Sequence, residues 1–345
     1  MRLTTRGLGA VAVVAFAVVM AAAFGARALN GLVVPLLVAL AGAVVSVART
    51  DGPTVGRRPV EAGFPGERRT VEVTVETDSP TAASVADAVG DGLSAPETRV
   101  ETTLDEGTTY EYDLRLDSRG ERRVGPLSVV VTDVLGLVEQ RFEDGRTTPV
   151  LVYPRVYDLR GGAGYDLRLL TDEVREGDRE EFDYLREYRR GDALRDVHWK
   201  SAAKRVDDEL VVKEFVADET VGSTMIAVEP APRGDEEELL AAAASVARYL
   251  LEREVAVGLL VAGDSLPPDT GDRHRHELLR TLALADLAPL DERDRRRADV
   301  VIHAGAGGAA VDVGGREIPF DRLRGDPVEA AALGADGSDA SEVVA

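Results

Sequence analysis

The residues best suited to chemistry lie in one segment from Tyr184 to Phe215, which reads YLREYRRGDALRDVHWKSAAKRVDDELVVKEF. This segment holds the only tryptophan and all three lysines of a 345-residue chain whose formal net charge is −21. Residues 185–205 carry seven basic and three acidic side chains, so positive charge gathers locally. Asp192, His198 and Lys200 are the side chains that a hydrolase or transferase could use here.

The patterns that would support catalysis are incomplete elsewhere in the chain. Ser201 lies near His198, but no third residue completes a triad. His274 and His276 are two positions apart, so a helix places them on different faces. His303 precedes a glycine-rich stretch that lacks the lysine and hydroxyl of a phosphate-binding loop. Cysteine is absent, which excludes thiolate catalysis, disulfides and Cys-based metal sites. We therefore expect no catalytic residue and no enzymatic activity.

Two interpretations of the basic segment remain open. Arginine pairs bidentately with carboxylates, so the segment could receive an acidic partner protein. Alternatively it forms an internal network that holds a connector to the following domain, with Trp199 as a buried anchor. The possible internal pairs join Arg186, Arg189 and Arg195 to Glu187, Asp192 and Asp196. We favour the internal network, because a Gly-Asp turn and a single tryptophan usually have structural roles in the fold.

The same segment closely resembles the signature of the domain of unknown function 58 family. The matching residues are Arg186, Glu187, Tyr188, Gly191, Asp192, Arg195, Trp199, Lys200, Ala202, Val212, Glu214 and Phe215. The upstream stretches RGERRVGPLSVVVTDVLGLVEQ and VLVYPRV are also similar to the family. The resemblance implies a carboxyl-terminal von Willebrand factor A-like α/β fold and no established enzymatic activity. It also implies partners: MoxR-type AAA ATPases and other von Willebrand factor A-like membrane proteins, in assembly or adaptor roles at the cell envelope.

The von Willebrand factor A-like fold carries its metal site on an Asp-x-Ser-x-Ser motif after the first strand, because oxygen ligands suit a hard cation. The corresponding stretch here is AVEPAPRG. Glu229 could replace the aspartate, but Ala231 and Arg233 stand at the serine positions and offer no side-chain oxygen. We expect this degenerate site to hold no metal, and we expect no other cofactor.

Two uncharged runs near the start, Leu8–Ala26 and Gly31–Ala48, are close to the length of a membrane span. We expect residues 1–50 to form a transmembrane hairpin. Arg27 is the one basic residue between the two runs. The basic residues that flank the outer ends of the hairpin are Arg2, Arg6, Arg49, Arg57, Arg58, Arg68 and Arg69. This distribution predicts cytoplasmic ends and cytoplasmic soluble domains. The alternative to a first membrane span is a cleaved signal peptide. The alternative role for the flanking arginines is contact with anionic headgroups.

Three further regions follow the hairpin. Residues 56–157 alternate apolar and polar side chains, as in RTVEVTVET and TTYEYDLRL, which predicts an antiparallel, all-β sandwich-like domain. Residues 158–221 form the signature connector. Residues 222–322 alternate buried strands with amphipathic helices, which predicts a doubly wound α/β domain, with Asp235 capping its first helix. Residues 323–345 are expected to be a disordered acidic tail.

The acidic, lysine-poor composition is typical of proteins from salt-loving archaea and argues against general binding of nucleic acid. We therefore expect a membrane-anchored, non-enzymatic protein that binds other proteins. The alternatives are an envelope enzyme and an extracellular, cation-dependent adhesion module.

Overall fold

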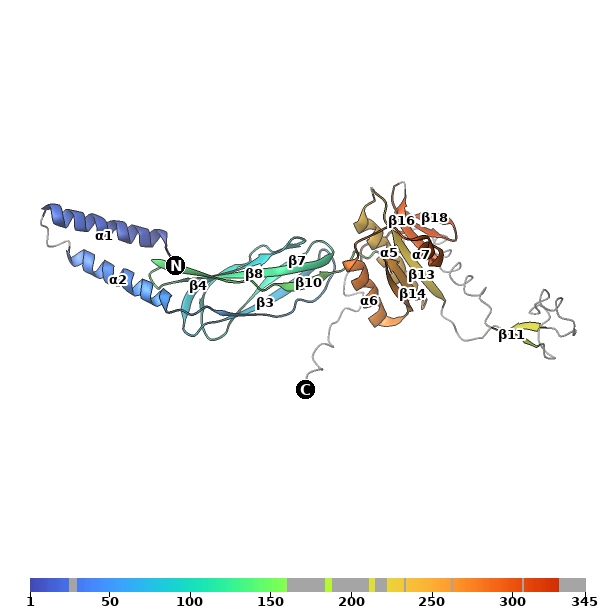
Figure 1. Cartoon of the computed structure of the whole chain (residues 1–345), viewed down its shortest axis with the longest axis horizontal. Helices are drawn as coiled ribbons and strands as arrows, with labels where there is room; N and C mark the ends of the chain where they lie inside the picture. The colour runs from blue at the N-terminus through green and yellow to red at the C-terminus, as the bar shows by residue number, and fades with distance from the viewer. Residues whose placement is uncertain are drawn as a thin grey trace. The chain divides into compact units, whose positions relative to one another are not determined.

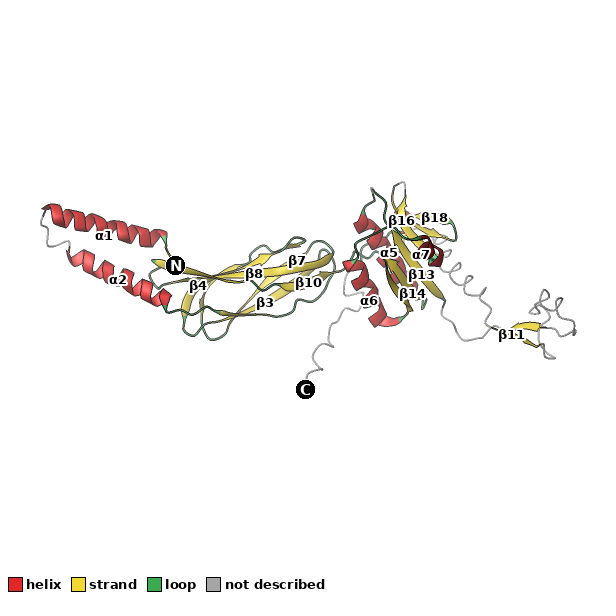
Figure 2. Ribbon diagram, viewed as in Figure 1, coloured by secondary structure: helices red, strands yellow, loops and turns green. Residues whose placement is uncertain are grey.

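The computed structural model describes residues 1–24, 30–159, 184–187, 211–214, 222–232, 234–261, 263–305 and 307–328. The chain divides into two compact units, Met1–Val152 and Tyr153–Ala345 (Figure 1). Figure 2 shows helices and strands in both units, and the first unit combines two helices with many strands. The two units are described separately below.

Helices α1 (Thr5–Phe24) and α2 (Asn30–Ala48) contact each other at the start of the first unit. Both are long and apolar enough to cross a membrane, judged by length and composition. Only 11% of the residues in the first apolar window and 17% in the second are buried. Their aliphatic side chains therefore face outward, where a lipid phase would solvate them better than water.

Two antiparallel sheets follow the helices. The first has the order β1-β9-β8-β4-β6, with β10 also paired to β8. Its strands are β1 (Arg2–Leu3), β4 (Thr81–Val89), β6 (Arg99–Leu104), β8 (Gly120–Thr132), β9 (Val138–Asp144) and β10 (Thr148–Val152). The second sheet has the order β2-β3-β7-β5, made of β2 (Thr54–Arg57), β3 (Arg68–Glu76), β5 (Leu93–Ser94) and β7 (Thr108–Leu116).

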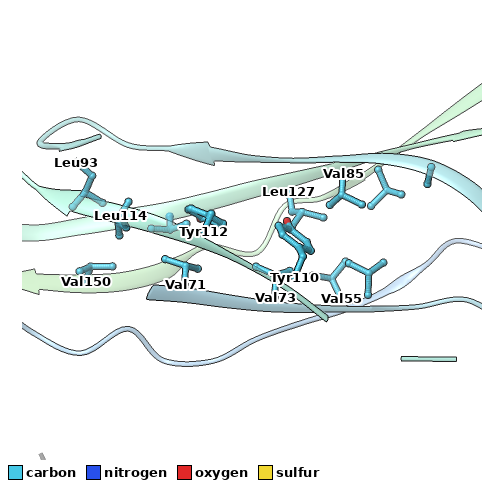
Figure 3. Packing of buried hydrophobic residues seen from close by; sticks show 14 of the residues in the cluster. Val55, Val71, Val73, Val85, Leu93, Tyr110, Tyr112, Leu114, Leu127 and Val150 are labelled. Carbon is cyan, nitrogen blue, oxygen red and sulfur yellow. The ribbon is translucent and has the colours of Figure 1, made fainter. Parts of the chain in front are cut away.

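The two sheets share one hydrophobic core (Figure 3). Val71, Val73 and Val75 of β3 are fully buried, and so are Leu114 and Leu116 of β7. Their polar neighbours in sequence are exposed or half-buried, because successive side chains of a strand point to opposite faces. The prediction of one buried and one wet face is confirmed for these strands.

The ends of the basic segment pair with each other. Strand β11 (Tyr184–Glu187) is antiparallel to β12 (Val211–Glu214), with Tyr184 opposite Glu214 and Glu187 opposite Val211. The signature residues Arg186, Glu187 and Glu214 thus lie on this two-stranded ribbon. The other residues of the signature lie outside the described part of the chain: Tyr188, Gly191, Asp192, Arg195, Trp199 and Lys200.

The second unit contains a sheet of order β15-β14-β13-β16-β17-β18. Its strands are β13 (Ser223–Glu229), β14 (Ala256–Val261), β15 (Asp264–Asp269), β16 (Val300–Gly305), β17 (Gly308–Val313) and β18 (Arg316–Pro319). The three strands predicted from apolar runs, β13, β14 and β16, are neighbours and parallel. The other pairings are antiparallel, so the sheet is mixed rather than the uniformly parallel sheet expected.

The difference arises from short hairpins at both edges of the sheet. β17 and β18 are joined at Gly314 and Gly315, which both have positive φ, and glycine adopts this conformation without steric cost. β15 folds back on β14 after Gly263, which also has positive φ. The sequence did not predict β15 (DSLPPD) and β18 (REIP), because both are short, polar and contain proline.

Helix α5 (Glu236–Leu251) packs against β13, β14, β16 and β17, and α6 (Gly271–Leu284) packs beside α5. Asp235 caps α5 as predicted, since its carboxylate accepts the Glu237 N–H at 3.0 Å. α7 (Glu292–Arg297) and α8 (Phe320–Leu323) are short.

The chain stays ordered past residue 322, where the tail was expected to begin. Gly325 N–H donates to the Asp158 carbonyl at 2.8 Å, and Val328 N–H donates to the Val156 carbonyl at 2.8 Å. Leu323 is fully buried. These contacts hold residues 323–328 against the second unit, and residues 329–345 lie outside the described part of the chain.

Candidate functional site

A cleft of about 670 Å³ opens in the second unit beside the carboxyl ends of β13 and β16. The chain leaves β13 through α5 toward β14 and later returns to the other side of β13 as β16. In open α/β sheets, ligands bind in the crevice at such a reversal of strand order. The lining comes from the segment that follows β13, from the start of α5 and from the β16–β17 hairpin.

Glu238 is the best-anchored carboxylate of the cleft. Its Oε2 accepts the Ala309 N–H at 3.2 Å, and its Oε1 lies 3.9 Å from Nη1 of Arg324. Gly308 has φ of +130°, and a Cβ placed there would come within 2.8 Å of the Glu238 carboxylate. A glycine at this position therefore allows Glu238 to approach the backbone of β17.

Asp235 and Glu238 give the cleft a negative charge. The first turn of α5 carries the positive end of the helix dipole, and Asp235 together with Glu236, Glu237 and Glu238 compensates it. Among the lining residues that the structure describes, the side chains beyond Asp235 and Glu238 are small or aliphatic. Such a site suits an arginine or lysine side chain, whose charge pairs with the carboxylates while its stem contacts the apolar lining.

The three positions of the degenerate metal site are not brought together as ligands. Glu229, at the end of β13, pairs with the guanidinium of Arg295 on α7. Ala231 lines the cleft, and Arg233 lies outside the described residues. Within the described ranges, no group of three His, Asp or Glu residues is placed to hold a metal ion.

Each described histidine that was considered for chemistry has a different backbone partner. His274 is buried on α6, and its Nε2 lies 2.6 Å from the Val257 carbonyl oxygen of β14, to which it donates. His276 is only half-buried and bonds through Nδ1 to the Asp272 carbonyl at 2.7 Å. His303 pairs with Ala310 in the β16–β17 ladder. His198 and Ser201 lie outside the described residues.

A buried charged network in the first unit was not predicted. Arg57 of β2 bonds Asp87 of β4 through Nη2 at 2.7 Å and Nε at 3.2 Å. Tyr112 of β7 donates its hydroxyl to Asp87 at 2.8 Å. Arg57 also donates to the Thr148 hydroxyl at 3.1 Å and the Val124 carbonyl at 3.4 Å. The network thus joins the two facing sheets.

Burial controls the titration of this network. Burial raises the pKa of Asp87 above its ordinary value, against the smaller lowering effects of the Arg57 charge and the Tyr112 hydroxyl. Burial and the Asp87 charge also raise the pKa of Tyr112 and of Tyr110. The Tyr110 hydroxyl is buried and has no hydrogen-bond partner among the residues that the structure describes.

The sequence places Arg57 among the basic residues that follow the second span, for which headgroup contact was the alternative role; the burial of Arg57 contradicts that alternative for this residue. Its side chain is only 6% exposed, and that of Asp87 is fully buried. Arg57 is therefore out of reach of lipid headgroups. The signal that could have revealed the network is Asp87 itself, which follows Ala83 and Val85 at an inward position of β4. A charge at such a position requires a buried partner.

Comparison with known proteins finds a family model that matches part of the second unit. Residues 184–305 match the family model described as "Protein of unknown function DUF58". This match begins at the β11–β12 ribbon and ends with β16, so it includes α5 and most of the cleft. No curated protein matches the chain.

Solved structures resemble only part of the chain, and weakly. The complex of zinc 2-glycoprotein and prolactin inducible protein from human seminal plasma contains a chain with 15% identity and a TM-score of 0.24, covering 30% of this chain and 96% of that one. The CARDB domain of a Pyrococcus furiosus protein, solved with di-metal ions, has 19% identity and a TM-score of 0.22, covering 30% and 93%. TM-scores this low support no assignment.

Proposed function

We propose that this chain is a membrane-anchored, non-enzymatic adaptor of the DUF58 type that binds other proteins through the cleft of its α/β unit. The observation that carries the proposal is that Asp235 and Glu238, at the start of α5, line one cleft beside the carboxyl ends of two parallel strands. A cationic side chain of a partner fits this charge and lining. The mixed sheet with parallel centre is consistent with a von Willebrand factor A-like fold, which we propose as its class.

The resemblance of residues 184–215 to the DUF58 signature suggests the partner. We propose a MoxR-type AAA ATPase, and secondarily other von Willebrand factor A-like membrane proteins, in envelope or complex assembly. The acidic surface fits a salt-loving archaeon, in which carboxylates keep a protein hydrated. We propose no cofactor and no nucleic-acid partner.

Changing Glu238 to glutamine is expected to weaken partner binding by about ten-fold, the effect of losing one charged contact of about 1.4 kcal/mol. Glutamine keeps an oxygen that can accept the Ala309 N–H, so the change removes charge and leaves the hairpin contact in place. Crosslinking followed by capture of the full-length chain from native membranes measures the partner recovered.

The matched control is Glu277→Gln, because Glu277 is exposed on α6 and does not line the cleft. It should recover as much partner as the unchanged chain. Equal recovery by the Glu238 and Glu277 variants, with unchanged circular dichroism, would exclude the cleft as the binding site. A second variant, Arg186→Glu, tests the basic segment independently of the cleft.

We also propose that α1 and α2 span the membrane and that both soluble units are cytoplasmic. A membrane-impermeant protease added to intact cells should leave residues after α2 undigested, whereas permeabilised cells should lose them within the same time. Digestion in intact cells would place the soluble part outside and would favour an adhesion module. The test depends on the side of the membrane only, and so does not depend on which partner is bound.

A further inference from the structure

The turn between β8 and β9 presents two aliphatic side chains to the surroundings. Val134 is 96% exposed and Leu135 is 55% exposed. The central positions of tight turns are usually occupied by Asn, Asp, Gly, Pro or Ser, which suit both water and the backbone geometry. Val134 and Leu135 satisfy neither preference, so their position needs another explanation.

The turn is held in one conformation by Asp133. Its Oδ2 accepts the Leu135 N–H at 2.9 Å, and its Oδ1 accepts the N–H groups of Leu137 at 2.6 Å and Val138 at 2.7 Å. Gly136 follows with φ of +65° and donates its N–H to the Asp133 carbonyl at 2.8 Å. The two aliphatic side chains are therefore fixed outward and cannot fold back on the sheet.

The same turn is attached to the ends of the apolar helices. Thr4 donates its backbone N–H to the Leu137 carbonyl at 3.0 Å and its hydroxyl to the Gly136 carbonyl at 2.5 Å. Leu137 and Val138 pack against Ala43 and Val47 of α2. The turn thus contacts the beginning of α1 and the last turns of α2.

These contacts fix the level of the turn relative to the apolar spans. The candidate spans are Thr5–Ala23 and Gly31–Ala48, so Thr4 and Val47 both lie at the boundary between apolar and polar sequence. β9 runs away from this boundary, which leaves Val134 and Leu135 at the helix-contacting end of the hairpin.

Arg6 also lies over the turn, because its Nη1 is 3.5 Å from the place of a Cβ on Gly136. A cation at this level suits anionic headgroups.

We propose that Val134 and Leu135 insert into the interfacial region of the bilayer and form a third membrane contact beside α1 and α2. This inference rests on the proposed membrane anchoring. The occupant of the exposed tip is lipid rather than protein, because the tip is continuous with two exposed apolar helices and carries no charge of its own. Aliphatic side chains at the headgroup boundary lose contact with water while the backbone of the turn stays satisfied by Asp133.

The absence of cysteine allows a direct test on the full-length chain. Single variants Val134→Cys and Leu135→Cys, each labelled with an environment-sensitive fluorophore, are reconstituted in phosphatidylglycerol vesicles with or without lipid brominated near the top of its acyl chains. We expect bromine to lower the fluorescence of both labels by about two-fold, because the quencher acts only at contact distance within the interface.

Two controls separate this inference from the anchoring on which it depends. Glu97→Cys places the label at an exposed residue just before β6, beside the end of β6 that lies away from the turn, and its fluorescence should not change. Phe16→Cys places the label on the exposed face of α1, which is 65% exposed at that residue, and it should be quenched. Quenching at Phe16 with none at Val134 and Leu135 would overturn the inference and leave the anchoring intact. No quenching at Phe16 would overturn both.

Discussion

Replacing Arg57 by methionine is expected to lower the free energy of unfolding of the first unit by about 3–5 kcal/mol, the usual cost of removing one partner from a buried ion pair. The change leaves the carboxylate of Asp87 buried with only the Tyr112 hydroxyl as a side-chain donor. It also removes the hydrogen bonds from Arg57 to Thr148 and Val124 of the opposite sheet. Chemical unfolding of the chain in detergent, followed by near-ultraviolet circular dichroism of the tyrosines, measures the loss.

The neighbouring ion pair provides the control. Arg58 contacts Glu72 at the same distance, 2.7 Å, but its side chain is 76% exposed. Exposed pairs contribute about 0–1 kcal/mol, so Arg58→Met should change the unfolding midpoint little. Equal losses in the two variants would show that burial of the Arg57–Asp87 pair does not determine its effect.

The cost of Arg57→Met should also depend on pH. Because the pKa of Asp87 is higher in the folded than in the unfolded chain, its contribution to stability is greatest in acid and declines as pH rises through the folded-state value. Loss of the Arg57 charge raises that folded-state pKa further, so the decline extends to higher pH in the variant. The difference in unfolding free energy between variant and unchanged chain therefore grows as pH rises. Adding Asp87→Asn to the variant should remove this dependence.

Changing Gly7 to alanine is expected to destabilise the contact between α1 and the β8–β9 turn by about 1–3 kcal/mol, as overpacking usually does. A Cβ on Gly7 would overlap the backbone carbonyl oxygen of Leu137, which cannot rotate away as a flexible side chain could. The same carbonyl accepts the Thr4 N–H, so displacing it weakens the attachment of the turn. Hydrogen exchange of the peptide that contains Leu137 and Val138 should become faster by about ten-fold.

Gly9→Ala is the matched control, because a Cβ on Gly9 meets nothing within 4 Å. Alanine favours the helix over glycine by about 1 kcal/mol, so this variant should be neutral or slightly more stable. If Gly7→Ala also leaves exchange at Leu137 unchanged, the helix and the turn are not in contact in solution.

Local patterns in the sequence predicted the individual helices and strands whose residues are close together in the chain. The apolar stripe predicted on the first helix of the α/β domain, Leu239, Leu240, Ala243, Val246, Ala247, Leu250 and Leu251, is buried except for the half-buried Leu251. Ala241, Ala242, Ala244 and Ser245 are buried as well, so α5 is covered on more than the predicted face. The alternation in β3 and β7 placed their core residues correctly. The apolar runs of β13, β14 and β16 identified the parallel centre of the second sheet.

Pairings between distant residues could not be read in the same way. Nothing in the sequence around Arg57 points to Asp87, which lies 30 residues later on a strand of the other sheet. Glu238 meets the backbone of Ala309 across 71 residues, a contact that no local pattern in the sequence reveals. The sequence places the turn at Val134 and Leu135 within a strand-rich stretch, and its position beside the helices depends on contacts with Thr4 and Gly7 far upstream.

The pairing of β11 with β12 determines what a change of length between these strands would do to the chain. The chain enters and leaves the basic segment through adjacent backbones, since Glu187 lies opposite Val211. An insertion or deletion between residues 187 and 211 therefore leaves both ends of this stretch on the same pair of strands, so it need not shift the rest of the chain.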